Sequence, residues 1–163
     1  MTRPAADPSP PRFAELSALS NFTFLTGGSH PEELMERAAL IGLPALAVAD
    51  VNSVAGIVRA HARAREIARA VRLRREALAQ GGPIGPPPPP GLPPTPALDL
   101  TNAPRLIPAA RVVLACGLTL TALPCDKAGW GRLCRLLSLG RLRAPKGDCQ
   151  LGLDDLLAWG EGM

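Results

Sequence analysis

The chain alternates between short apolar runs and longer segments with helical periodicity. The clearest apolar run is Ala45–Ala49, between Pro44 and Asp50, and its length and flanks predict a strand buried on both faces, as in a parallel sheet. After a polar turn, the next residues recur at the three- and four-residue intervals of one helical face: Val54, Ile57, Val58 and His61. A strand, a turn and a helix in this order form half of a βαβ unit, in which functional polar residues usually follow the strand. Asp50 occupies that position.

Two elements are predicted upstream of this run. Residues 13–19 alternate between apolar and polar types, as in a strand. A helix is predicted over 31–41, because Ser29 and Glu32 have the spacing of a capping box and Gly42 follows as its terminator. Its buried face is expected to carry Leu34, Ala38 and Ile41.

The helix that follows Asp50 is predicted to continue to Ala79. Its apolar stripe goes on through Ala64, Ile67, Ala68 and Val71, while six arginines cover the rest: Arg63, Arg65, Arg69, Arg72, Arg74 and Arg75. An arginine-covered helix is typical of a solvated face. A contact with nucleic acid or with another subunit is the alternative.

Two segments are expected to lie outside the folded core. Residues 1–12 are polar and proline-rich and predict a disordered tail. Residues 80–104 contain a polyproline run, which favours an extended, solvated conformation. We interpret this segment as a disordered insertion between 13–79 and 105–163, the two parts of one domain. A proline-motif ligand for another protein is the less favoured alternative.

Strands and helices are predicted again after the insertion. Residues 106–107 and 111–115 form either one bent strand or two short ones, and Cys116-Gly117 predicts a tight turn to a strand over 118–123. Asp126 then caps a helix over Lys127–Gly140 that buries Trp130, Leu133, Leu136 and Leu137. A last helix is predicted over Leu153–Trp159, with Asp154 and Asp155 in its first turn.

Composition limits the classes of function. The 163 residues suffice for one domain with a hydrophobic core. The net charge of +4 comes mostly from arginine, which admits nucleic acid as a partner but also follows from a composition rich in Arg, Ala and Pro. The four cysteines include no CxxC pair, and neither a secretion signal nor a membrane span is found. We therefore expect reduced thiols and a cytoplasmic protein with no membrane contact.

Four stretches together resemble a known family. They are FAELSALSNFTFLTGGSHPEEL (13–34), LPALAVADVNSVAGIVRAH (43–61), RLIPAARV (105–112), and DKAGWGRLCRLLSLGR with KGDCQL after it. In this order they resemble the N-terminal polymerase-and-histidinol-phosphatase (PHP) domain of bacterial C-family DNA polymerases of the DNA polymerase III alpha type, most closely the error-prone branch. The resemblance implies an α/β fold, a distorted (β/α)7 barrel, of which this chain would be a fragment that stops before the polymerase palm.

The resemblance also implies where a metal site would lie. Active members use histidines, aspartates and a glutamate to hold divalent metals for phosphoester hydrolysis. Only one corresponding position keeps a ligand type in this chain, Asp50, and the others are Ser17, Leu19, Thr26, Val51 and Arg111. Because Arg111 would put a fixed positive charge beside the metals, we expect a degenerate site with no catalytic residue and no metal cofactor. Magnesium, manganese or zinc would bind only if the site were active.

Three polar residues have simpler interpretations. Asp50 is expected to cap the helix at Ser53–Val54 unless it binds a metal. His30, beside Pro31, is interpreted as a helix-entry residue, and His61 as a structural histidine on a partly buried face.

By resemblance, the chain is expected to be a non-catalytic scaffold in an error-prone, translesion DNA polymerase. Its partners would be the palm, fingers and thumb, DNA through them, and other translesion-synthesis proteins. It would brace neighbouring domains through Trp130, Leu133 and the arginine helix. Two alternatives remain: a free-standing PHP-family metal-dependent phosphoesterase, and an interaction fragment that acts through the proline run.

Overall fold

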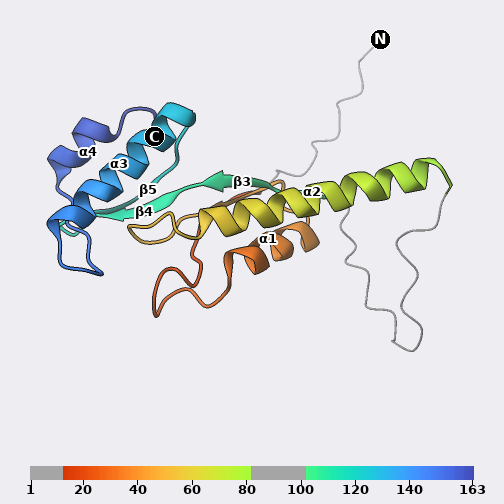
Figure 1. Ribbon diagram of the computed structural model, residues 1–163, viewed down its shortest axis with the longest axis horizontal. Helices are drawn as coiled ribbons and strands as arrows, with labels where there is room; N and C mark the ends of the chain where they lie inside the picture. The colour runs from red at the N-terminus through yellow and green to blue at the C-terminus, as the bar shows by residue number, and fades with distance from the viewer. Residues whose placement is uncertain (1–12, 82–101) are drawn as a thin grey trace, which may run out of the picture.

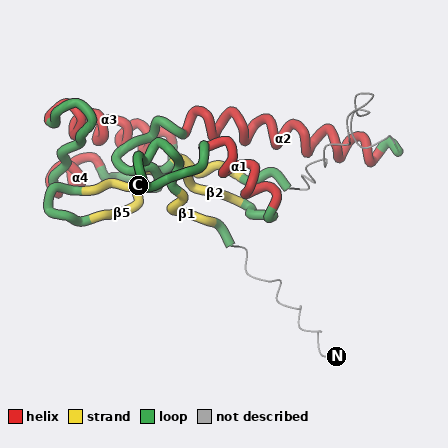
Figure 2. The backbone as a smooth tube through the Cα atoms, turned by 90° about the horizontal axis from the view of Figure 1, so that it is seen from below, coloured by secondary structure: helices red, strands yellow, loops and turns green. Residues whose placement is uncertain are grey.

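A computed structural model describes residues 13–81 and 102–163 of the chain as a mixed α/β structure (Figure 1). In its first part, β1 (Glu15–Ala18), β2 (Ala45–Val48) and β3 (Arg105–Pro108) form a parallel sheet in the order β1-β2-β3. The helices α1 (Pro31–Leu40) and α2 (Ile57–Ala79) connect and cover these strands. Figure 2 shows both helices on the same side of the sheet. The predicted α/β class with a buried parallel strand is confirmed.

The second part is a hairpin covered by helices. Strands β4 (Ala110–Val113) and β5 (Thr119–Ala122) pair antiparallel, and α3 (Lys127–Arg143) and α4 (Leu153–Trp159) follow. The predicted tight turn is confirmed, since Gly117 has a φ of 86° and the Leu114 N–H donates to the Leu118 carbonyl at 2.9 Å. In α3 the predicted cap is also present: an Asp126 carboxylate oxygen accepts from the Gly129 N–H at 2.7 Å. The helix runs three residues further than the predicted end at Gly140, and Leu142 and Arg143 in this extension have high helix propensity.

The segment 105–113 joins the two parts as two short strands. Its first half, β3, pairs with β2, and its second half passes beside the residues that follow β2, through a parallel bridge between Val51 and Arg111. Ala109, between the two strands, is fully buried against Ala47 and Ala49. The parallel strands and the hairpin do not close into a barrel within the described residues. This open arrangement agrees with the expectation that the chain is a fragment of a larger barrel.

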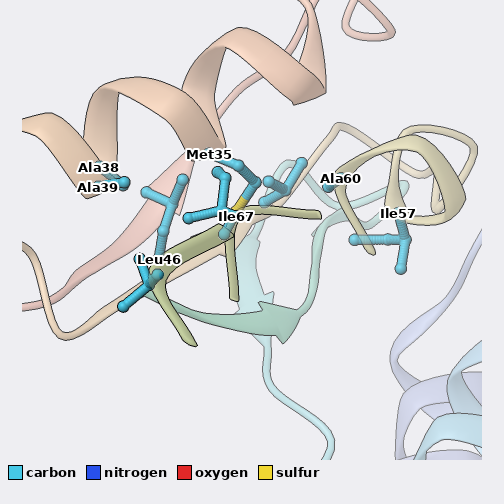
Figure 3. Packing of buried hydrophobic residues seen from close by; sticks show 9 residues of the cluster. Met35, Ala38, Ala39, Leu46, Ile57, Ala60 and Ile67 are labelled. Atoms are coloured by element: carbon cyan, nitrogen blue, oxygen red, sulfur yellow. The ribbon is translucent and has the colours of Figure 1, made fainter. Parts of the chain in front are cut away.

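Two hydrophobic clusters hold the structure together. The first joins α1, α2 and β2 through Met35, Leu46, Val48 and Ile67 (Figure 3). The second joins the hairpin, α3 and the segment before α4, through Val112, Leu133, Leu136, Leu137 and Leu151. Trp130 and Val54 pack against both clusters. Leu133 is fully buried, so the expectation that it braces a neighbouring domain is wrong.

The start of α1 differs from the prediction. The N-cap is His30 and not Ser29, and the Glu33 carboxylate accepts from the His30 N–H at 2.7 Å. Glu32, the predicted capping residue, instead forms an ion pair with Arg59 on α2. Of the predicted buried residues only Ala38 is fully buried. Ile41 is 55% exposed because the chain leaves the helix at Gly42, which has a φ of 76°.

The start of α2 is three residues later than predicted. The helix begins at Ile57 with Gly56 as its N-cap, since residues 53–56 form turns in which the Ser53 hydroxyl accepts from the Ala55 N–H at 3.2 Å. The buried face consists of Ile57, Ala60, Ile67 and Val71, which pack in the cluster with α1 and β2. Val58, His61 and Ala68 lie off this face and are exposed, so the predictions that Val58 and Ala68 belong to the buried stripe and that His61 is partly buried are wrong. The predicted end at Ala79 is confirmed.

The predicted tail lies outside the described residues, as does most of the predicted insertion. At the insertion's end, Asn102 donates to the Leu43 carbonyl, Pro104 is buried and Ala103 packs on the first cluster. No helix in the described ranges is long and apolar enough to cross a membrane.

Thiol reactivity tests the packing of the second part. Burial raises the pKa of the Cys134 and Cys149 thiols, whereas Cys116 and Cys125 are exposed. Because the thiolate is the reactive form, we expect Ellman's reagent at pH 8 to label two thiols fast and two slowly. The fast phase should disappear in the double variant Cys116→Ser, Cys125→Ser. A single phase for all four thiols in the native protein would contradict the packing of α3 against residues 149–151.

Candidate functional site

Asp50 is the centre of the polar site at the carboxyl end of β2. Its side chain is only 1% exposed, and three donors from the loop after β1 surround it. One carboxylate oxygen accepts from the Ser20 N–H and from the Thr23 hydroxyl, each at 2.8 Å, and the other accepts from the Ser20 hydroxyl at 2.7 Å. Hydrogen bonds to a charged acceptor are about twice as strong as neutral ones. The arrangement therefore satisfies a buried carboxylate without a cation.

Local geometry brings these donors to Asp50. The loop folds back on itself, because the N–H groups of Thr23 and Gly27 donate to the carbonyls of Ser20 and Thr23 at 2.9 and 3.0 Å. The Thr23 hydroxyl also accepts from the Val51 N–H at 3.0 Å, which links the loop to the end of β2. Gly27 lies so close to the Ser20 carbonyl that a Cβ atom there would overlap it. The loop can form only with glycine at this position.

The start of α2 closes the other side of the carboxylate. A Cβ atom on Gly56 would lie 3.0 Å from an Asp50 oxygen and 3.1 Å from the Ser20 hydroxyl, so the helix approaches as closely as glycine allows. The positive end of the helix dipole favours a nearby carboxylate. However, no side chain caps this helix, and the prediction that Asp50 caps it at Ser53–Val54 is wrong. Asp50 instead binds the loop that follows β1.

Arg111 lies at the same edge of the structure. Its backbone N–H donates to the Asp50 carbonyl at 3.0 Å, its carbonyl accepts from the Asn52 N–H at 2.8 Å, and its guanidinium donates to the Ser17 carbonyl at 3.4 Å. Four of the six predicted positions, Ser17, Asp50, Val51 and Arg111, therefore come together. Of the other two, Thr26 lies in the loop, where its N–H donates to the Thr23 carbonyl at 3.2 Å, and Leu19 has no polar side chain.

The residues at this site do not fit the metal cluster that the PHP resemblance implies. Metal clusters of that kind need several His, Cys, Asp or Glu ligands, and no group of three or more such residues occurs in the part of the chain that the structure describes. Asp50 is the one ligand type at the six positions, and its oxygens already accept from Ser20 and Thr23. His30 contacts Asn21 at 2.8 Å, and His61 lies on the exposed surface of α2. Neither histidine supplies a ligand to this site.

Three residues that the sequence did not single out complete the site. Ser20 and Thr23 donate to Asp50. Asn52, with a φ of 46°, accepts from the Val113 N–H at 3.0 Å through its side chain and from Arg141 at 2.9 Å through its carbonyl. A signal existed in the two hydroxyl residues three positions apart directly after the first strand, because such residues often bind nearby polar groups in turns. The long-range partner, Asp50, could not be identified from that spacing.

The chain is similar in sequence to one class of protein, the error-prone DNA polymerases. The chain is 48% identical, over 93% of its length, to the error-prone DNA polymerase of Ruegeria pomeroyi. It is 41% identical over 93% of its length to error-prone DNA polymerase 1 of Rhizobium meliloti and 39% identical over 91% to the error-prone DNA polymerase of Rhodopseudomonas palustris. The chain spans only 14%, 10% and 10% of the lengths of these relatives.

Family models and solved structures add little to these sequence similarities. No protein-family model matches the chain. Among solved structures, a Bifidobacterium adolescentis protein assigned as a metal-dependent phosphoesterase matches 91% of this chain and 43% of its own, with 17% identity and a TM-score of 0.46. That similarity is too low to define the fold by itself.

Proposed function

We propose that this chain, which is homologous to one segment of the error-prone DNA polymerases, is a PHP-type module whose hydrolytic site has become a structural one. It would serve as a scaffold within a damage-tolerant, translesion polymerase in the cytoplasm. The nucleotidyl-transfer chemistry would belong to the palm of that polymerase.

The main support for this proposal is the set of hydrogen bonds that the Asp50 carboxylate accepts. A catalytic metal ligand needs oxygen lone pairs that face an open position for metal and water. The Asp50 carboxylate instead accepts three hydrogen bonds from Ser20 and Thr23 in a buried setting. The nearby Arg111 guanidinium adds a positive charge beside Ser17, which would repel a divalent cation. Both features favour a structural role over hydrolysis.

Exposed apolar side chains in β1 and in the loop after it support a protein partner. Phe24 and Leu25 at the loop tip are 87% and 101% exposed, and Phe13 and Leu16 beside or within β1 are 65% and 44% exposed. In the described sheet β1 pairs with β2 alone, so one of its edges is available for pairing. Exposed apolar clusters and open strand edges are typical of protein contacts. The partner we propose is the remainder of the polymerase, and through it DNA and other translesion-synthesis proteins.

Metal content and turnover together test the loss of hydrolysis. We expect purified chain, after manganese or zinc loading and desalting, to retain no stoichiometric metal by elemental analysis. We also expect the native chain to hydrolyse p-nitrophenyl phosphate no faster than buffer does. It should also be no faster than an Arg111→Glu variant, in which a carboxylate replaces the guanidinium. Two or more tightly held metals per chain, with turnover that is lost in Asp50→Asn, would instead establish a metal-dependent phosphoesterase.

A further inference from the structure

We propose that one face of α2, formed by Arg65, Arg69 and Arg72, binds the phosphate backbone of nucleic acid. We call these three residues the outer arginine face. The binding itself goes beyond the scaffold role, although the choice of nucleic acid as the partner rests on the proposed association with a polymerase.

The arginines of α2 fall into two groups with different surroundings. Arg59 and Arg63 point toward α1, where they form ion pairs with Glu32 and Glu36, the latter at 2.8 Å. Arg63 also pairs with Glu66 at 2.7 Å, and these partners raise the pKa of its guanidinium. This inner group therefore has carboxylates that explain its presence. It fixes α2 to α1.

The residues of the outer arginine face lack ion pairs of this kind with α1. Its residues are spaced by four and three, which places them on one face of the helix, away from the buried stripe of Ile57, Ala60, Ile67 and Val71. Within the described ranges, neither Arg65 nor Arg69 has a carboxylate within ion-pair distance. Arg72 is 3.7 Å from Glu76 and its side chain is 72% exposed. Glu66 lines the same hollow as these three arginines, but its carboxylate pairs with Arg63. Among the described residues, the ion pair with Glu76 is thus the one ion pair of the outer arginine face.

The shape of this surface suits a polyanion. From residue 65 to residue 72 the helix rises about 10 Å, which is close to three nucleotide steps of about 3.4 Å in a duplex strand. The C-terminal half of α2, drawn in green, extends past α1 and β3 in Figure 1, and Arg65, Arg69 and Arg72 are exposed. The exposed residues nearby are His61, Ala62, Glu66 and Ala68. Because α2 carries no Phe, Tyr or Trp, the face lacks the large aromatic anchors typical of protein interfaces. Arginine is the residue that best matches phosphate.

Salt-dependent DNA binding tests this face with a matched pair of variants. The probe is a fluorescein-labelled duplex of arbitrary sequence, titrated with the 163-residue chain between 50 and 200 mM NaCl and read by anisotropy. Arg65→Gln with Arg69→Gln removes two charges from the outer arginine face. Arg59→Gln with Arg63→Gln removes two charges from the inner group of the same helix. Circular dichroism establishes that both variants are folded under the assay conditions.

We expect the outer variant to bind DNA several-fold more weakly at 50 mM NaCl. The slope of log affinity against log salt should become shallower by about 1.8, or about 0.9 for each phosphate that an arginine no longer neutralises. The inner variant should keep the native slope. Absence of measurable DNA binding by the native chain, or equal weakening in both variants, would overturn the proposal. Competition by polyglutamate as strong as by unlabelled DNA would overturn it in favour of an acidic protein partner. None of these outcomes depends on whether the Asp50 site holds metal.

Discussion

Replacing Asp50 with alanine is expected to destabilise the chain by about 4 kcal/mol, because it leaves buried donors without an acceptor. The Ser20 N–H, the Ser20 hydroxyl and the Thr23 hydroxyl all donate to this carboxylate. A loss of this size is a large part of the stability of a typical domain. We expect it to lower the melting temperature by roughly 10 °C, as followed by circular dichroism.

Asp50→Asn provides the matched comparison. The asparagine keeps one acceptor oxygen for the Ser20 N–H and the Thr23 hydroxyl, while the Ser20 hydroxyl can rotate to accept from the new amide group. We therefore expect Asp50→Asn to cost about 1–2 kcal/mol, clearly less than alanine. Equal melting temperatures for the native chain and Asp50→Ala would show that the hydrogen bonds of the loop contribute nothing, and would remove the main support for a structural Asp50.

Replacing Gly27 with alanine is expected to have the second large effect, while the same change at the next residue has almost none. At Gly27 the new Cβ would overlap the Ser20 carbonyl oxygen, a backbone atom that cannot move without opening the loop. At Gly28 a Cβ would have no neighbour within 4 Å. We expect Gly27→Ala to cost at least about 2 kcal/mol and Gly28→Ala to stay within about 0.5 kcal/mol of the native chain, measured by urea unfolding.

The pair of glycine variants also reports on the Asp50 site. Ser20 supplies both the carbonyl that Gly27 approaches and two of the three donors to Asp50. The free-energy costs of Gly27→Ala and Asp50→Ala should therefore be less than additive in the double variant, since residues that share partners couple. Equal stability of Gly27→Ala and Gly28→Ala would mean that the loop does not take the conformation described above.

Arginines in two regions of the chain show why charge alone does not define a site. Arg111 is held by backbone pairing beside Asp50, with its guanidinium at the Ser17 carbonyl. Arg65 and Arg69 lie on an open helix surface without a carboxylate partner among the described residues. The proposed structural site at Asp50 and the proposed nucleic-acid surface on α2 are thus different regions of one small chain. Metal analysis and DNA binding test them separately.

The sequence by itself determined most of the elements. Apolar runs bounded by proline and aspartate located β2, and periodicity located α2 to its last residue. Gly42, Gly117 and Asp126 marked turns and a cap that the structure contains, since the conformational preferences of such residues act over a few neighbours. The family resemblance also predicted that Asp50 is the one residue of a metal-ligand type among the six expected positions.

Only the tertiary structure decided what those residues do. The capping box moved from Ser29 to His30, and α2 began three residues late, because the Asp50 loop and the ion pairs with α1 fix where each helix can start. Asp50 proved to bind Ser20 and Thr23, thirty and twenty-seven residues away in the chain. Spacing along a sequence cannot predict such a contact, because it depends on how β1, β2 and the loop pack together in space. The partition of the α2 arginines into paired and open faces was decided in the same way, by the position of α1.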